Sequence, residues 1–320
     1  MKVLVTGITG FAGSHLVDYI LAEKKSVEIV GIQRWRSRTE NVEHFLDKVR
    51  MVECDLRDAS SVRDVLGDVR PDWIFHLAAQ SFVPTSWTAP TESLYTNIIG
   101  QLNIFEAVKK LHIMPRIQLA CSSEEYGMVY ENELPIRETN PLRPLSPYAV
   151  SKVGQDMLGY QYFMSFKLPV IRTRGFNHEG PRRGPVFVCS DFAKQIADIE
   201  KGRRPPVIRV GNLEARRDFT DVRDVVRAYR LLMERGEPGE VYNVCTGVDV
   251  AVQELADQLL ALATRPMRFE ADPELLRPVD VPVLRGDHAK LTAATGWEPE
   301  ISLTQTLADL LDDWRRQVKE

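Results

Sequence analysis

The chain has 320 residues, of which 44% are hydrophobic and 27% charged, and its formal net charge is −4. This composition is typical of a globular protein and excludes a disordered or fibrous chain. Proteins that bind nucleic acid are usually basic, so the acidic balance argues against nucleic acid as a partner. No run of about 18 apolar residues occurs, which argues against a membrane-spanning helix and a membrane partner.

The cysteines and histidines show no pattern of a disulfide framework or a metal site. Cys54, Cys121, Cys189 and Cys245 lie far apart without a CxxC pair, so we expect reduced, buried thiols in a cytoplasmic protein. The six histidines lack HxxxH or HExxH spacing, and we predict no metal site. The first residues are typical of a strand rather than a signal peptide.

Short apolar runs alternate with helical patterns along the first half of the chain. We predict helices at 14–23, 59–66, 91–111 and 147–166, and strands at 2–6, 27–32, 49–54, 72–77, 116–120 and 168–173. This alternation predicts an α/β fold with a doubly wound parallel (Rossmann) sheet.

The pattern changes after about Phe176, where a polar loop at 177–185 is followed by short strands, helices and proline turns. We therefore expect two domains. Residues 1–176 form the sheet together with strands that return from later segments, and 177–320 form a smaller mixed α/β lobe. Segment 304–316 places four apolar residues on one helical face, which predicts packing: Leu307, Leu310, Leu311 and Trp314.

A glycine-rich loop, TGITGFAG at 6–13, directly follows the first predicted strand. Glycines let the backbone turn tightly and approach a pyrophosphate, and the helix that follows offers free N–H groups. This position predicts a dinucleotide site, with contacts from Gly7, Thr9, Gly10, Phe11, Ala12 and Gly13.

Because the second strand is followed by Arg34, Arg36 and Arg38 and no acid, we favour NADP(H) over NAD(H) and expect Arg34 to bind the 2′-phosphate.

Tyr148 and Lys152 lie four residues apart on one face of a predicted helix. A tyrosine pKa is normally about 10, and we expect the lysine ammonium to lower it and make Tyr148 a proton-transfer group. Ser122 and Glu124 end the fifth strand, where ligands bind in parallel sheets. We predict that Ser122 hydrogen-bonds a substrate oxygen and that Glu124 is a candidate general base, whereas Glu125 is expected in a solvated turn.

Together these motifs resemble the extended short-chain dehydrogenase/reductase family that acts on nucleotide sugars, and in particular its GDP-mannose branch. The resemblance covers nearly the whole chain and implies that Ser122, Tyr148 and Lys152 are catalytic. It implies further cofactor contacts from Asp55, Leu56, Leu77, Ala78, Ala79, His178 and Arg183. It also implies contacts to the sugar nucleotide from Asn177, Val188, Lys194, Arg217 and Arg277, whose arginines suit a diphosphate.

The resemblance implies a GDP-sugar substrate, but different segments of the chain resemble enzymes that catalyse different reactions. SSEEYG at 122–127 and RRDFTD at 216–221 are similar to the reductase pattern. They favour NADPH-dependent reduction of the C4 ketone of GDP-4-keto-6-deoxy-D-mannose, as in GDP-rhamnose-type synthesis. Residues 34–38 and 177–184 are similar to the dehydratase pattern, so GDP-mannose 4,6-dehydration is the alternative. A C4 epimerase and a non-catalytic dinucleotide sensor are further alternatives. The arginine-rich loop also implies a homodimer or homotetramer.

Overall fold

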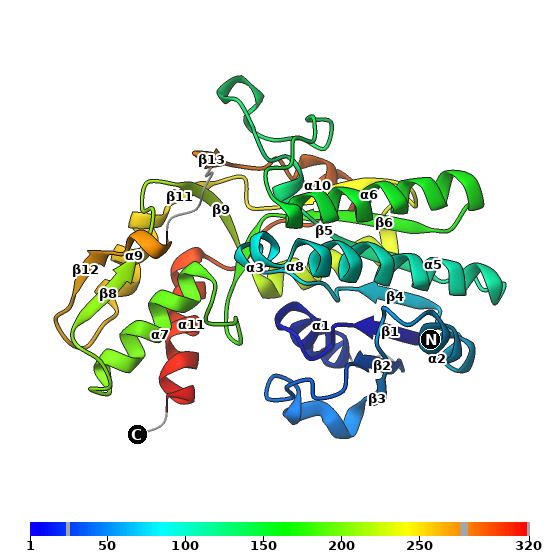
Figure 1. The fold of residues 1–320 in the computed structure, drawn as a ribbon, viewed down its shortest axis with the longest axis horizontal. Coiled ribbons are helices and arrows are strands. Elements are labelled where there is room, and N and C mark those ends of the chain that lie inside the picture. Colours follow the sequence, from blue (N-terminus) through cyan, green and yellow to red (C-terminus); the bar gives the residue numbers. More distant parts are fainter. Residues whose placement is uncertain (24–25, 276–280, 319–320) are drawn as a thin grey trace.

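The computed structural model describes residues 1–23, 26–275 and 281–318. Its largest element is a parallel seven-stranded sheet with the order β10-β6-β5-β4-β1-β2-β3 (Figure 1). This architecture confirms the predicted doubly wound sheet. The strands are β1 (Lys2–Thr6), β2 (Glu28–Gln33), β3 (Arg50–Glu53), β4 (Trp73–His76), β5 (Arg116–Ser122), β6 (Val170–Gly175) and β10 (Val241–Val244).

Helices cover both faces of this sheet because its strands are apolar on both sides. Val3 and Val5 of β1 face one core and Leu4 faces the other, and all three are 0% exposed. Such continuous apolar strands are typical of parallel sheets buried on both faces. One face is covered by α1 (Phe11–Ala22), α8 (Val222–Arg235) and α10 (Ala289–Thr295), the other by α2 (Ala59–Val69), α5 (Gly100–Lys110) and α6 (Pro147–Phe166).

The helix predicted over 91–111 is confirmed to within one residue at each end, but it contains a π-helical turn that was not predicted. It consists of α4 (Pro90–Leu94), a π-helical turn η2 (Tyr95–Ile99) and α5. The buried Asn97 of η2 accepts a hydrogen bond from Gln80 N at 2.8 Å and donates to Gln80 O at 3.1 Å and Ser151 Oγ at 2.8 Å. We attribute the wider turn to these contacts, because π-turns commonly mark positions where a helical side chain serves a site. Two short helices were not predicted, η1 (Glu43–Lys48) and α3 (Val83–Thr88).

A smaller body lies beside the sheet (Figure 1) and contains α7 (Val188–Glu200), α9 (Val252–Ala261), α11 (Leu303–Gln317), β8 (Val207–Val210) and β12 (Arg268–Ala271). The predicted packing face of α11 is confirmed, since its four apolar residues lie in this body's core. A four-stranded sheet contains β7 (Asn177–Glu179), β9 (Arg216–Asp221), β11 (Asp249–Ala251) and β13 (Val283–Leu284). The remaining 3-10 turns are η3 (Ser123–Glu125), η4 (Glu131–Glu133) and η5 (Pro273–Leu275).

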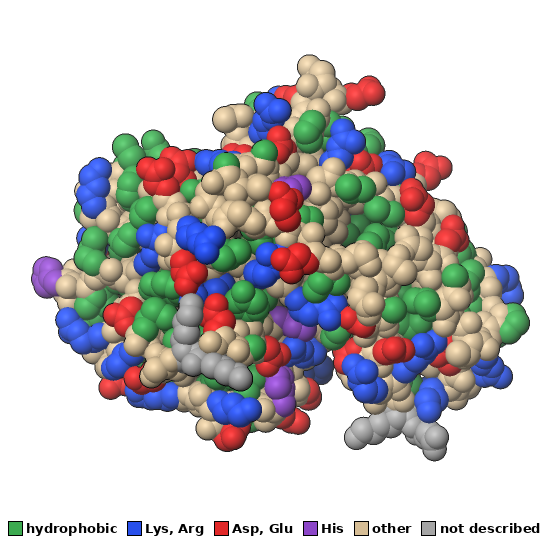
Figure 2. Space-filling model, turned by 180° about the vertical axis from the view of Figure 1, so that it is seen from behind, with side chains coloured by type: hydrophobic (Ala, Val, Ile, Leu, Met, Phe, Trp, Pro, Cys, Tyr) green, Lys and Arg blue, Asp and Glu red, His purple; other side chains and the backbone are tan. Residues whose placement is uncertain are grey.

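The surface and the cysteines agree with the composition. Acidic and basic side chains are interspersed on the face shown in Figure 2. All four cysteines are buried and free, as predicted. Among the described residues, none of the helices combines the length and apolar character needed to cross a membrane.

Candidate active site

A cavity of about 490 Å³ lies along the C-terminal ends of β1, β2, β4, β5 and β6. Because these strands are parallel, the loops that follow them meet at one edge of the sheet. The cavity brings together the four predicted catalytic residues, Ser122, Glu124, Tyr148 and Lys152. It is also lined by every predicted cofactor residue: Gly7, Thr9, Gly10, Phe11, Ala12, Gly13, Arg34, Asp55, Leu56, Leu77, Ala78, Ala79, His178 and Arg183.

The glycine loop packs so closely against neighbouring backbone that it has no room for side chains at two positions. Gly7 has a φ of +72°, and a Cβ added there would lie 2.9 Å from Ala78 N. A Cβ at Gly13 would lie 2.2 Å from the carbonyl oxygen of Gly7. Gly10 is the N-cap of α1 and has no side chain that could cap the first backbone N–H groups of the helix. The backbone N–H groups at this end therefore suit a phosphate group.

The Thr6 hydroxyl fixes the neighbouring loop after β4. It accepts hydrogen bonds from the backbone N–H groups of Leu77 at 3.2 Å and Ala78 at 3.1 Å. Its own hydrogen is then donated to Nδ1 of His76 at 2.9 Å. Burial, with a smaller effect of Lys152, lowers the pKa of His76 to about 3, so the ring is neutral. Thr6 thus fixes the start of the loop after β4, whose residues Leu77 and Ala78 line the cavity beside Gly7.

The far end of the cavity is rich in arginine. The backbone N–H of Arg34 donates to Ser37 Oγ at 3.0 Å, and Arg34 lines both the main cavity and an adjoining one of about 380 Å³. Arg36 lines only the adjoining cavity, and Arg38 lines neither. Asp55 accepts side-chain hydrogen bonds from Arg57, which lower the pKa of the Asp55 carboxyl. The Asp55 carboxylate, which was predicted to contact the cofactor, is therefore paired with an arginine.

Tyr148 and Lys152 are buried on one face of α6, as their spacing predicted. Lys152 Nζ donates to the Ala120 carbonyl oxygen at 2.7 Å and lies 5.9 Å from the Tyr148 ring centroid. Burial raises the pKa of Tyr148, and a hydrogen bond from Ser122 only partly opposes this. We expected a lowered pKa for Tyr148, and this was wrong for the structure, because desolvation of the hydroxyl is the largest effect and raises it.

The two adjacent glutamates differ in their surroundings. Glu124 is half-buried and lines the cavity. Glu125 is 0% exposed, so the prediction of a solvated turn was wrong. Its Oε1 accepts the backbone N–H of Ser122 at 2.9 Å, and this capping contact closes η3 immediately after β5.

Arg182 attaches the loop after β7 both to α1 beside the large sheet and to α11 of the smaller body. Its guanidinium donates to Asp18 Oδ2 at 2.6 Å, and its backbone N–H donates to Asp313 Oδ2 at 2.7 Å. This attachment places His178 parallel to Phe11, with ring centroids 5.8 Å apart. It also places the Arg183 guanidinium 3.4 Å from the Phe187 ring centroid.

The predicted sugar-nucleotide contacts are less concentrated. Asn177 lines the cavity, but Val188, Lys194 and Arg217 do not. Lys194 Nζ pairs with Asp198 at 2.6 Å, and Arg217 Nη1 donates to the Val281 carbonyl oxygen at 2.6 Å. Arg277 lies outside the described residues.

Several other lining residues were not predicted from the sequence. Gln33, Gln80 and Ser81 follow or end strands, and that position is a signal that could have identified them. Arg57 is two residues from Asp55, which was predicted. Tyr229 comes from within α8 and has no local signal, because only the packing of α8 on β5 and β6 brings it to the cavity.

Comparisons with known proteins agree with this geometry. A family model described as GDP-mannose 4,6 dehydratase matches residues 4–310. A GDP-6-deoxy-D-mannose reductase from Pseudomonas aeruginosa is 34% identical over 100% of this chain and 99% of its own length. A GDP-mannose 4,6-dehydratase from Vibrio cholerae is 30% identical over 97% of this chain and 92% of its own length.

A solved structure of RMD from Pseudomonas aeruginosa complexed with NADPH has a TM-score of 0.85 and 34% identity, and the match covers 99% of both chains. Family model, relatives and structure thus match this chain over nearly its full length. The chain therefore belongs to the GDP-mannose 4,6-dehydratase family of extended short-chain dehydrogenase/reductases, as its motifs predicted.

Proposed function

We propose that the chain is an NADPH-dependent reductase of the C4 ketone of GDP-4-keto-6-deoxy-D-mannose. The observation that carries this proposal is the end-to-end match to a GDP-6-deoxy-D-mannose reductase at 34% identity. The convergence of Ser122, Tyr148 and Lys152 on one cavity supports it. We place the reaction in the cytoplasm, because four buried, unbridged cysteines are typical of a reducing compartment.

The cavity fits NADP(H) in its backbone shape and its charges. The glycine loop, whose close backbone packing leaves no room for a Cβ at Gly7 or Gly13, would hold the pyrophosphate. Arg34 and Ser37 would hold the 2′-phosphate, and Lys152 would hold the nicotinamide ribose. The solved RMD structure contains NADPH, which supports this assignment. When bound, NADPH supplies the hydride for the C4 carbonyl.

Tyr148 then donates its proton to the developing C4 alkoxide, and Ser122 hydrogen-bonds the same oxygen. Burial suits this direction of transfer, because a raised pKa keeps Tyr148 protonated before the reaction. The Lys152 ammonium, held by the Ala120 carbonyl, supplies positive charge near the phenolate that forms. Among the proposed substrate contacts that the structure describes, Asn177 is the one that lines this cavity. Val188, Lys194 and Arg217 remain proposed contacts of the GDP moiety.

GDP-mannose 4,6-dehydratase is the second candidate, and the position of Glu124 favours it. Glu124 lines the same cavity, and its charge is among those that raise the pKa of Tyr148. A carboxylate beside the acid–base tyrosine can serve as the base that removes the C5 proton during dehydration.

We also propose a homo-oligomer that buries one face of α6. Val150, Met157 and Met164 recur every seven residues on this helix and are 47%, 41% and 49% exposed, with Tyr160 beside them at 45%. An exposed apolar stripe of this length is typical of an interaction surface. A second copy of the chain is the simplest partner, because the same stripe on each copy is self-complementary about a twofold axis.

The first prediction concerns the cofactor. Arg34→Ala removes a charge-assisted contact that contributes about 1.5–3 kcal/mol, so NADPH affinity should fall by roughly tenfold or more while NADH affinity barely changes. Titration of cofactor fluorescence measures both. Arg38→Ala is the control, because Arg38 lines neither cavity. Equal losses for NADPH and NADH would show that Arg34 does not recognise the 2′-phosphate.

The second prediction concerns proton transfer. Tyr148→Phe should lower kcat by ~10²–10⁴-fold and leave the melting temperature and NADPH affinity close to parental. Tyr160→Phe, on the exposed side of the same helix, should keep full activity. If Tyr148→Phe retains most of its activity on every GDP-sugar tested, Tyr148 is not the proton donor.

The third prediction separates reductase from dehydratase. Ketone reduction needs no base at C5, so Glu124→Gln should cost less than roughly tenfold in rate, whereas loss of a dehydratase base should cost ~10²-fold or more. The exposed Glu131→Gln serves as the control. In deuterated water, mass spectrometry of the product should find no deuterium at C5. A severe Glu124→Gln defect together with C5 labelling from GDP-mannose would identify a dehydratase.

The fourth prediction concerns assembly. The parental chain should sediment as a dimer or tetramer, and the double variant Met157→Glu/Met164→Glu should dissociate it, because it places charges within the buried stripe. Met114→Glu is the control, since Met114 is 61% exposed and lies away from α6. A monomeric parent, or a double variant that sediments like the parent, would contradict the proposed interface.

A further inference from the structure

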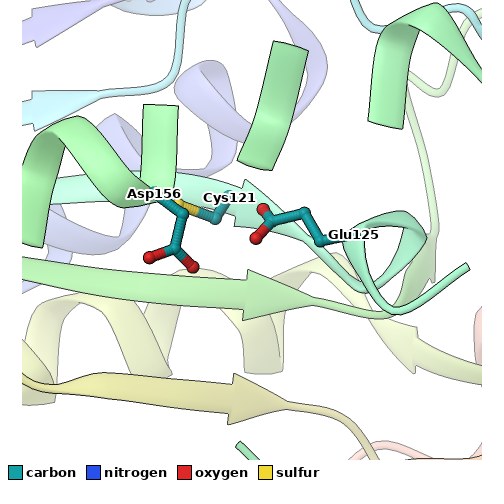
Figure 3. Close-up of side chains that lie close together, drawn as sticks. All are labelled: Cys121, Glu125 and Asp156. Carbon is teal, nitrogen blue, oxygen red and sulfur yellow. The ribbon is translucent and has the colours of Figure 1, made fainter. Parts of the chain in front are cut away.

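Glu125 and Asp156, drawn with Cys121 in Figure 3, form a buried carboxyl pair. Both are 0% exposed, and one oxygen of each lies within 4.8 Å of the other and of the Cys121 sulfur. Glu125 ends η3, next to Ser122 and Glu124, whereas Asp156 lies one helical turn beyond Lys152 on α6. The pair therefore links the two elements that carry the proposed catalytic residues.

Asp156 is the ionised member of the pair. Arg174 Nε donates to its Oδ2 at 2.8 Å, and Arg172 Nη1 donates to its Oδ1. Burial would raise the pKa of this carboxyl, but the charges of Arg174 and Arg172 outweigh burial and hold it below its usual range. Both oxygens thus have a cationic partner, which is what a buried carboxylate requires.

Glu125 is the neutral member. Burial and the Asp156 charge raise its pKa well above the usual range, although Arg174 Nε lies 3.4 Å from Oε2. Two ionised carboxylates this close together would repel each other and could only accept hydrogen bonds, so a proton on one of them is favoured. Since Asp156 is ionised, Glu125 carries that proton.

The same three residues do not suit a metal ion, although cysteine and carboxylates are common ligands. Asp156 already receives hydrogen bonds from two guanidinium groups, and a cation would have to displace or oppose these positive charges. Burial raises the pKa of the Cys121 thiol well above its usual value, whereas a metal needs the thiolate. The geometry therefore favours a shared proton.

We propose that Glu125 is a positioning residue that holds Ser122 against Tyr148. Its proton would be shared with Asp156 on α6, one carboxylate oxygen of which lies within 4.8 Å of a Glu125 oxygen, and its Oε1 accepts the Ser122 backbone N–H at 2.9 Å. The Ser122 hydroxyl in turn hydrogen-bonds Tyr148 on the same helix. This inference rests on the proposed function only in that Ser122 and Tyr148 carry the reaction, as they would in the reductase and in the dehydratase alike.

Two substitutions at Glu125 test this role. Glu125→Gln keeps a carbonyl that accepts from Ser122 and an amide that donates to Asp156, so kcat should stay within roughly threefold of parental. Glu125→Met removes both bonds, and misplacement of the hydroxyl should lower kcat by roughly ten- to a hundredfold. The Kd for NADPH should stay unchanged in both variants. A large kcat loss in Glu125→Gln would overturn the proposal.

A double-mutant cycle asks whether Glu125 acts through Ser122. In a Ser122→Ala background, Glu125→Met should cost little more activity, because the hydroxyl it positions is already absent. The cycle is measured with whichever reaction the parental enzyme catalyses. If the parental enzyme does not reduce the keto sugar, that result contradicts the reductase proposal but not the positioning role of Glu125. The same fold-loss in both backgrounds would overturn it.

Infrared spectroscopy tests the shared proton without any turnover. The parental protein at neutral pH should show the carbonyl stretch of a protonated carboxylic acid, and Glu125→Gln should lack this band. Because Glu125→Gln preserves the size of the side chain, this comparison also stands if Glu125→Met fails to fold. The absence of a Glu125-dependent band would show that the carboxyl is ionised and would overturn the proposal.

Discussion

The parallel register of β1, β4, β5 and β6 is the constraint on which the whole site depends. It sets Thr6 opposite His76 and Ser122 opposite Gly175. These strand ends and the loops that follow them therefore open on one cavity. The helix α6 then crosses this edge with Tyr148 and Lys152 facing the cavity. A slip of one residue in β5 would turn Ser122 to the other face of the sheet.

Burial of polar groups is the second feature of the site, and it determines protonation. His76, Tyr148 and Glu125 all lie where desolvation favours the neutral form. A buried group stays ionised where oppositely charged partners offset the cost of desolvation, as Arg172 and Arg174 do for the Asp156 carboxylate. A neutral tyrosine is the form that a ketone reductase needs at the start of its reaction. A dehydratase or an epimerase begins instead by removing a proton from the substrate, and that step requires the phenolate.

Motifs local in sequence could be predicted, and contacts between distant segments could not. The glycine loop and the Tyr148/Lys152 pair follow from spacing within one element, and both line the cavity. The raised pKa of Glu125 depends partly on Asp156, which lies on another element. Asn97 likewise contacts Ser151 only because α6 packs against η2. For Val188, Lys194 and Arg217, the resemblance alone supplied a role, and the described cavity does not include them.

The central claim is that this family member reduces a ketone, and substrate consumption tests it most directly. The parental protein should oxidise one NADPH for each GDP-4-keto-6-deoxy-D-mannose consumed and should form GDP-6-deoxy-D-mannose. It should leave GDP-mannose unchanged when only NADP⁺ is supplied. Consumption of GDP-mannose under those conditions, with release of a 4-keto-6-deoxy product and no oxidation of NADPH by the keto sugar, would contradict the account.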